Sequence, residues 1–250
     1  MRFIIAVVFI LCSVVPCTAQ DINALIKEGY RLESIPNEKA SFQKFKEVLK
    51  INATNIYALN KCSELCVRIG QRETNKQLRD DYYTAAKIYA ETALKIDPNN
   101  SDANCAMAMA LGRSSMSKSG KEKITNAKEI KKYVDIAIKN DPKNYKAWHV
   151  LGRWHYEISN LNVLETTVVK VLYGGLPAAS LSESIKSFEK VHDLTPGFIL
   201  NYYEMAKAYK ENNNKTKAIA YINEMLTLPI HTEDDLTIKE KGRELLKAWK

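Results

Sequence analysis

The sequence predicts an all-α protein built from about five helical hairpins in one continuous superhelix. Two segments resemble each other closely, YAETALKIDPNN at 89–100 and YVDIAIKNDPKN at 133–144. A small residue followed by apolar residues at helical spacing recurs five times along the chain, and no stretch alternates apolar and polar residues as a strand does. Recurrence at a few tens of residues is typical of stacked helical repeats, so we expect no linker.

Each predicted hairpin has the residue types that two closely packed helices need. A small side chain lets the helix axes approach, larger apolar residues interlock, and proline ends the second helix. The small residues are Gly29, Ser63, Ala108, Gly152 and Ala206, at separations of 34, 45, 44 and 54 residues. This pattern resembles the tetratricopeptide repeat, about 34 residues long and stacked in a right-handed superhelix. The second, third and fourth hairpins therefore carry about 11, 10 and 20 extra residues over that repeat length.

The three sets of extra residues differ in composition. Residues 68–82 are charged and predict longer helix ends around a turn, whereas the polar stretch 112–126 predicts mainly loop. From 161 to 172, apolar residues recur at threes and fours, which predicts an inserted amphipathic helix that Gly174 and Gly175 end. We expect this helix to pack on the superhelix, with a partner-facing or membrane-facing helix as the alternatives.

The last helix is predicted to begin between Thr232 and Asp235, where a threonine precedes an acid by three residues. It should cover the exposed end of the stack, as solenoids require. Its expected apolar face consists of Leu236, Leu245, Leu246 and Trp249.

Residues 1–19 have the three-part form of a secretory signal. Arg2 precedes an apolar run that ends with Pro16 and the small-residue segment Cys17-Thr18-Ala19. The run is shorter than the roughly 20 residues of a membrane-spanning helix. We therefore expect cleavage after Ala19 and export to the periplasm or the extracellular space, leaving residues 20–250 as a single domain. Loss of Arg2 would lower the formal net charge from +8 to +7.

Cleavage would also remove Cys12 and Cys17 and leave three cysteines. Cys62 and Cys66 are four residues apart, which is neither a CxxC redox pair nor half of a zinc site. The sequence predicts that these two residues are small buried side chains, and the odd number of remaining cysteines, with Cys105 as the third, indicates a chain held by core packing rather than by disulfides.

No stretch of the sequence matches a catalytic signature, a phosphate-binding loop or a nucleic-acid-binding motif. The four histidines, at 149, 155, 192 and 231, have no metal-ligand spacing with one another. We therefore predict no enzyme activity, no cofactor, no metal and no nucleic-acid partner.

Positions 2, 5, 9, 12 and 13 of each first helix line the concave face in the tetratricopeptide architecture. Here those positions carry cations and aromatic rings, which suit an extended, possibly acidic, peptide or protein. The alternative is a set of ordinary solvated lysines and arginines. The candidate partner-binding residues are Arg113, Lys146, His149, Arg153, Tyr156, Tyr203, Lys207 and Lys210, together with Arg68. Membrane contact is a less favoured prediction, and the sequence predicts no oligomeric state.

The segment from Asp141 onward resembles the regulator of microtubule dynamics family. The resemblance rests on AWHVLGRWHYEISNLN, KVLYGGLP, LTPGFILNYYEMAKAYKENNNKTKAIAY and LPIHTEDDLTIKEKGRELL. It implies a helical-repeat adaptor whose eukaryotic relatives are associated with microtubules, spindle poles and mitochondria. A non-enzymatic binding scaffold is thus the predicted function, with membrane-peripheral binding through 161–172 and microtubule regulation as alternatives.

Overall fold

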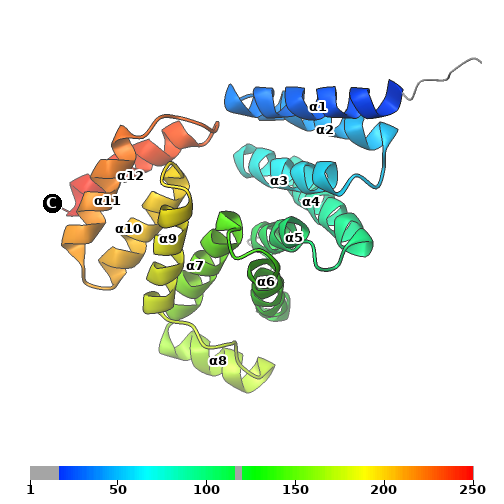
Figure 1. Cartoon of the computed structure of the whole chain (residues 1–250). Helices are drawn as coiled ribbons and strands as arrows, with labels where there is room; N and C mark the ends of the chain where they lie inside the picture. The colour runs from blue at the N-terminus through cyan, green and yellow to red at the C-terminus, as the bar shows by residue number, and fades with distance from the viewer. Residues whose placement is uncertain (1–16, 116–119, 250) are drawn as a thin grey trace, which may run out of the picture.

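The computed structural model describes residues 17–115 and 120–249, and these residues form helices without any strand. The helices curve from the N-terminal pair around to the C-terminal pair, as Figure 1 shows. They are α1 (Cys17–Ser34), α2 (Glu38–Ile51), α3 (Ile56–Arg72), α4 (Lys76–Ile96), α5 (Ser101–Ser114), α6 (Gly120–Asn140), α7 (Tyr145–Ser159), α8 (Val163–Tyr173), α9 (Leu181–Leu194), α10 (Ile199–Glu211), α11 (Lys215–Thr227) and α12 (Asp235–Trp249).

Ten of these helices pair as the predicted five hairpins. The pairs are α1 with α2, α3 with α4, α5 with α6, α7 with α9, and α10 with α11. Helix α12 then packs on α10 and α11 and covers that end of the stack. The predicted architecture of five hairpins with a C-terminal capping helix is therefore confirmed for the described part of the chain.

Asparagine begins most of the helices. At each such start the side-chain Oδ1 accepts the N–H of the residue three positions later, which satisfies one of the unpaired donors of the first turn. The capping residues are Asn37, Asn55, Asn75, Asn100, Asn144, Asn162 and Asn214. Several of them close a short turn after the preceding helix, so the chain re-enters a helix within a few residues.

The small residues lie where the two helices of a hairpin touch. A Cβ at Gly29 would lie 2.8 Å from Phe45 Cζ, and one at Gly152 would lie 2.7 Å from Phe188 Cε1. The Ser184 hydroxyl also donates to the carbonyl of Gly152 at 2.8 Å, which fixes α9 against α7. These contacts confirm the physical reason for the repeat pattern.

The extra residues of the second and third hairpins lengthen helices. Helix α3 continues to Arg72 and α4 starts at Lys76, as predicted. The prediction of mainly loop for 112–126 is wrong, because α5 continues to Ser114 and α6 already begins at Gly120. Lysine and glutamate are good helix formers even where nothing packs against them. Residues 116–119, within this predicted loop, lie outside the described residues.

The predicted inserted helix exists as α8, but its expected packing is not observed. No residue of α8 is buried, and it contacts α6, where Lys128 Nζ donates to the carbonyl of Tyr173 at 2.8 Å. Val163 and Leu164 are 84% and 74% exposed. Figure 1 shows α8 standing apart from the stack below α7 and α9. Gly174 and Gly175 end it with positive φ angles, as predicted.

Helix α12 begins at Asp235, whose carboxylate accepts the N–H groups of His231 and Thr232 and the Thr232 hydroxyl. The predicted apolar face is correct for Leu245, Leu246 and Trp249, which pack on the C-terminal core. It is wrong for Leu236, which is exposed, whereas Ile238 is buried in its place.

Most of the predicted signal segment, residues 1–16, lies outside the described residues, and α1 begins at Cys17. Within the part that the structure describes, no helix is long and apolar enough to cross a bilayer. Cys62 and Cys66 are free and buried, as the sequence predicted, and Cys105 is free and buried too. Burial raises the pKa of Cys66 and of Cys105 to about 12.

Candidate partner-binding groove

The inner face of the superhelix contains a cavity of about 870 Å³. Residues of helices α3, α5, α6 and α7 line it, together with residues 194–200 and the segment 231–238. Apolar side chains make up much of the wall, among them Val67, Ile130, Val150, Trp154 and Leu200. A cavity of this size can hold several side chains of an extended segment.

Five of the nine predicted groove residues line this cavity and four do not. Arg68, Arg113, Lys146, His149 and Arg153 lie in its wall. Tyr156, Tyr203, Lys207 and Lys210 are not part of this wall.

Arg113 is a cation of the cavity wall whose guanidinium lacks an acidic partner within ion-pair distance among the described residues. Its guanidinium forms no hydrogen bond or ion pair with any other residue of the described ranges 17–115 and 120–249. Burial, and then the positive charge of Arg153, lowers the pKa of Arg113. The guanidinium still carries its charge at neutral pH, because its ordinary pKa exceeds 12. A carboxylate that entered the cavity would be the partner that Arg113 lacks.

Arg153 has two acidic neighbours at longer distances. Its Nε lies 3.8 Å from Glu204 Oε1, and its second terminal nitrogen lies 3.5 Å from Glu157 Oε1. Burial would raise the pKa of Glu204, but Arg153 and Lys207 outweigh burial and hold that pKa below its ordinary value. Arg153 is therefore partly neutralised, and Arg113 contributes more of the uncompensated charge.

His149 lies in the wall as a buried, neutral side chain rather than as an exposed cation. Its Nδ1 is 3.1 Å from Asn201 Oδ1, and the Asn201 amide nitrogen donates to the Phe188 carbonyl, which orients the amide. Nδ1 therefore carries the proton, and Nε2 is an acceptor without a hydrogen-bond partner in the described structure. Burial lowers the pKa of His149 to about 4.

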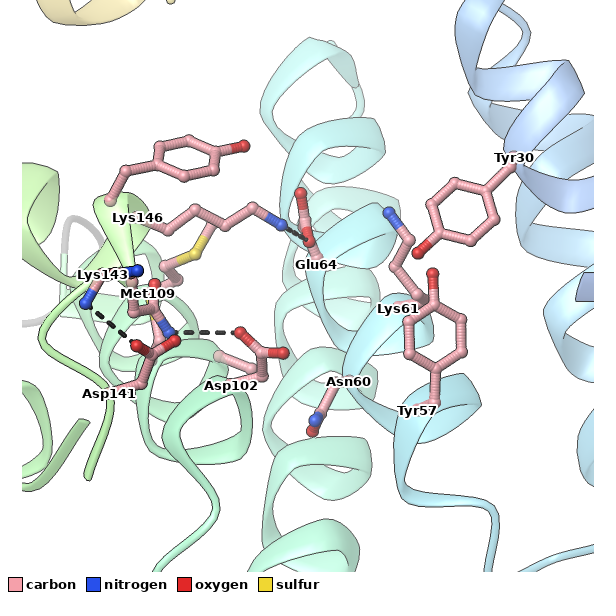
Figure 2. Close-up of a pocket in the computed structure, with 14 residues that line it drawn as sticks. Tyr30, Tyr57, Asn60, Lys61, Glu64, Asp102, Met109, Asp141, Lys143 and Lys146 are labelled. Atoms are coloured by element: carbon pink, nitrogen blue, oxygen red, sulfur yellow. Dashed lines mark hydrogen bonds and ion pairs between the residues drawn. The ribbon is translucent and has the colours of Figure 1, made fainter. Parts of the chain in front are cut away.

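Lys146 is held by Glu64, with 2.5 Å between Nζ and Oε2. Both residues line the large cavity and also a second cavity of about 350 Å³. Figure 2 shows this smaller cavity, with Lys146 directed at Glu64 and the rings of Tyr30 and Tyr57 on the far side of Lys61. The ion pair forms part of the wall that the two cavities share.

Lys207 belongs to a separate aromatic cluster. Its Nζ lies 5.0 Å from the ring centroid of Tyr156 and 5.5 Å from that of Tyr203, and it donates to Glu204 at 2.9 Å. Because Lys207 already has an aromatic and an acidic partner, its charge is compensated within the chain.

Sequence reasoning found cations of the groove and missed the acids that pair with them. Glu64 occupies the same repeat position as Arg153 and Lys207, directly after the small residue, so that position could have identified it. Glu204 and the acidic segment before α12 had no comparable signal. No group of three or more His, Cys, Asp or Glu residues in the described ranges could hold a metal ion.

The hairpin stack and its lined inner cavity define a tetratricopeptide-type helical-repeat protein. The chain belongs to the regulator of microtubule dynamics protein 1-3 family, whose sequence profile matches residues 25–250. The match extends well upstream of the segment from Asp141 on which the resemblance in the sequence was based.

Curated relatives agree with this assignment. Regulator of microtubule dynamics protein 2 of Rattus norvegicus is 26% identical over 226 residues, covering 90% of this chain and 53% of the relative. The Homo sapiens protein of the same name is 30% identical, with 71% of this chain and 43% of the relative covered. Protein 1 of Mus musculus is 26% identical over 94% of this chain and 76% of the relative. The chain thus spans about half the length of several curated relatives that it matches.

Solved structures support the fold alone. A thermophilic TPR protein of Thermus thermophilus superposes with a TM-score of 0.65 at 13% identity, covering 90% of this chain and 99% of that one. PilF of Pseudomonas aeruginosa gives a TM-score of 0.51 at 13% identity, with 92% and 86% covered.

Proposed function

We propose that this chain is a non-enzymatic scaffold that holds an extended, acidic segment of a partner protein in its inner cavity. The observation that carries the proposal is Arg113, a cation in the wall of a cavity of about 870 Å³ with no carboxylate partner among the described residues. The apolar wall around it suits a segment in which acids alternate with apolar side chains.

Selection of peptides from a random 12-residue phage library tests this proposal. We expect Asp and Glu to be enriched over the input on the wild-type chain, and the enriched peptides to be lost on R113Q. The matched control is R243Q, because Arg243 is an exposed arginine on α12 that pairs only with Glu240. Peptides without acids, or equal recovery on R113Q and the wild type, would contradict the proposal.

A second candidate function is peripheral membrane binding through α8. The helix exposes Val163, Leu164, Val168, Val171 and Leu172 and carries only two charged residues, Glu165 and Lys170. Exposed Lys121 and Lys123 lie on α6, the helix that α8 touches, and they would favour an anionic bilayer.

Flotation with vesicles of 70% phosphatidylcholine and 30% phosphatidylserine tests this second candidate. We expect the wild-type chain to float and V171D/L172D to stay at the bottom of the gradient. T166D/T167D adds the same two charges to exposed positions of the same helix and should still float. A wild-type chain that fails to float excludes this candidate.

Microtubule regulation is a third candidate, and it rests on the names of the family relatives. Because the chain spans about half the length of several of these relatives, the activity of the whole relatives is only proposed for this chain. Co-sedimentation with taxol-stabilised microtubules tests it directly, since a chain that stays in the supernatant excludes the candidate.

Export is a separate proposal, and the composition of residues 1–19 supports it. N-terminal sequencing of the protein purified from its native source tests it. A first residue at Gln20 is expected, and an intact residue 1 would contradict it.

A further inference from the structure

The acidic segment before α12 joins the two ends of the superhelix. Arg72 lies at the end of α3, and its two terminal nitrogens lie 3.1 Å from Glu233 Oε2 and 3.0 Å from Asp234 Oδ2. These acids follow Arg72 by more than 160 positions in the sequence. Figure 1 shows the segment reaching from α11 toward the α1–α2 end before it returns into α12.

Glu233 also contacts the start of α2. The backbone N–H of Glu38 donates to Glu233 Oε1 at 2.7 Å, so this carboxylate occupies a helix N-terminus, where negative charge is favoured. The side chain of Glu38 is fully buried and forms ion pairs with Arg68 and Arg72. One carboxylate from the C-terminal part of the chain therefore completes a charged cluster that belongs to the N-terminal hairpins.

The segment is held in shape by its own end of the molecule. Asp235 accepts three hydrogen bonds from His231 and Thr232, and Lys239 donates to the carbonyls of Leu226 and Leu228. The backbone around Glu233 and Asp234 is consequently fixed by contacts within the C-terminal part of the chain. The two side chains could leave Arg72 without unfolding the segment that carries them.

The same segment forms part of the wall of the large cavity. His231, Thr232, Asp234 and Asp235 line it, opposite Arg68 and Gln71. Asp234, which binds Arg72, is therefore part of the cavity wall, whereas Arg72 and Glu233 are not among the lining residues.

We propose that residues 231–235 form a clasp that closes the groove, and that the acidic partner segment takes over Arg72 when the clasp opens. The partner chemistry follows from the clasp, because Arg72 already binds two adjacent carboxylates. This inference rests on the proposed function for its partner, while the closure itself rests on the contacts that Glu233 and Asp234 make with Arg72 and Glu38.

Closure is tested by the distance between spin labels at two exposed positions, Gln43→Cys on α2 and Thr237→Cys on α12. The labelled chain carries C12S and C17S, and its other three cysteines are buried. We expect a narrow distance distribution in the wild type and a longer, broader one in E233Q/D234N. E240Q/E244Q removes the same number of charges from the exposed face of α12 and should leave the distribution narrow. An unchanged distribution in E233Q/D234N would overturn the clasp.

The partner class is tested by fluorescence anisotropy with a fluorescein-labelled copy of residues 228–238, LPIHTEDDLTI. If the groove is open in about a tenth of wild-type molecules, the peptide should bind E233Q/D234N about tenfold more tightly than the wild type. Adding R72Q to the opened variant should remove this binding, as should replacing the two peptide acids that correspond to Glu233 and Asp234, in LPIHTQNDLTI. If R72Q or the loss of the two peptide acids left the binding unchanged, the proposal of an acidic partner would be overturned.

Failure of the scaffold proposal can be distinguished from failure of the clasp proposal. R113Q should weaken capture of partner peptides without changing the distance between the labels on α2 and α12. Peptide binding that is independent of Arg113 would therefore contradict the scaffold proposal and leave the distance result unaffected.

Discussion

Lys146 on α7 and Glu64 on α3 form an ion pair across the inner face of the superhelix, with 2.5 Å between Nζ and Oε2. Burial would raise the pKa of Glu64, but Lys146, Lys61 and Arg68 outweigh it and hold that pKa well below its ordinary value. Burial would lower the pKa of Lys146, but the charge of Glu64, its hydrogen bond and Tyr145 together outweigh burial and raise that pKa. The pair therefore stays charged at neutral pH and ties hairpins that are not neighbours in the sequence.

E64Q should lower the free energy of unfolding by about 3 kcal/mol, because it leaves the Lys146 ammonium without its counter-charge in a mostly buried position. Urea denaturation measures this loss. The matched control is E157Q, whose carboxylate is 61% exposed and 3.5 Å from Arg153. This variant should change stability by no more than about 0.5 kcal/mol. A loss that is equal in the two variants would show that the buried pair contributes nothing.

G152A should destabilise the fold by about 2 kcal/mol, since the added Cβ would lie 2.7 Å from Phe188 Cε1 and overpack the α7–α9 contact. G112A should instead stabilise the fold. The only atom near a Cβ at Gly112 is Ile130 Cδ1 at 3.9 Å, so alanine should stabilise α5 by about 0.5–1 kcal/mol. Thermal denaturation of the two variants side by side measures both effects, and a stable G152A would refute the close helix approach.

The unfolding free energy should fall as the pH drops from about 6.5 to about 4. The unfolded chain takes up a proton at His149 near the ordinary pKa of 6.5, whereas burial holds the folded-state pKa at about 4. This single group can account for at most about 3 kcal/mol across that window. Urea denaturation at several pH values should show a flatter profile for H149N than for the wild type. H231N, at an exposed histidine, should keep the wild-type slope.

The three buried thiols should react with Ellman's reagent only after unfolding. Cys62, Cys66 and Cys105 are at most 2% exposed, and burial raises their pKa values, so the reactive thiolate is scarce as well as inaccessible. In a C12S/C17S chain at pH 8, no thiol should react in the native state and three should react in guanidinium chloride. Rapid reaction of a native thiol would contradict the packing of α3 or α5.

The architecture could be predicted because the contacts that build a hairpin lie within one repeat. Gly152 and Phe188 are such a pair, and the spacing of small and large residues in the repeat predicts their contact. The error at 112–126 arose because polar composition does not distinguish a loop from the solvated first turns of a helix such as α6. For α8 the periodicity predicted the helix, but periodicity cannot say whether an apolar face meets protein or solvent.

The groove could be predicted only in part, because some of its contacts join hairpins that are distant in the sequence. The concave positions of Arg113 and Arg153 follow from the repeat register. Which cations already have acidic partners depends on the curvature of the whole stack, because Glu64 reaches Lys146 and Asp234 reaches Arg72 from distant hairpins. A local pattern contains no information about that curvature, and so the acids of the site were missed.

The central claim is that an acidic partner segment binds the inner cavity through Arg113. Isothermal titration of an acidic peptide selected on the wild-type chain against wild type, R113Q and R243Q tests it most directly. A lost charge-assisted hydrogen bond is worth about 1.5–3 kcal/mol, so R113Q should bind at least about tenfold more weakly while R243Q binds as the wild type does. Equal affinity for wild type and R113Q would contradict the claim.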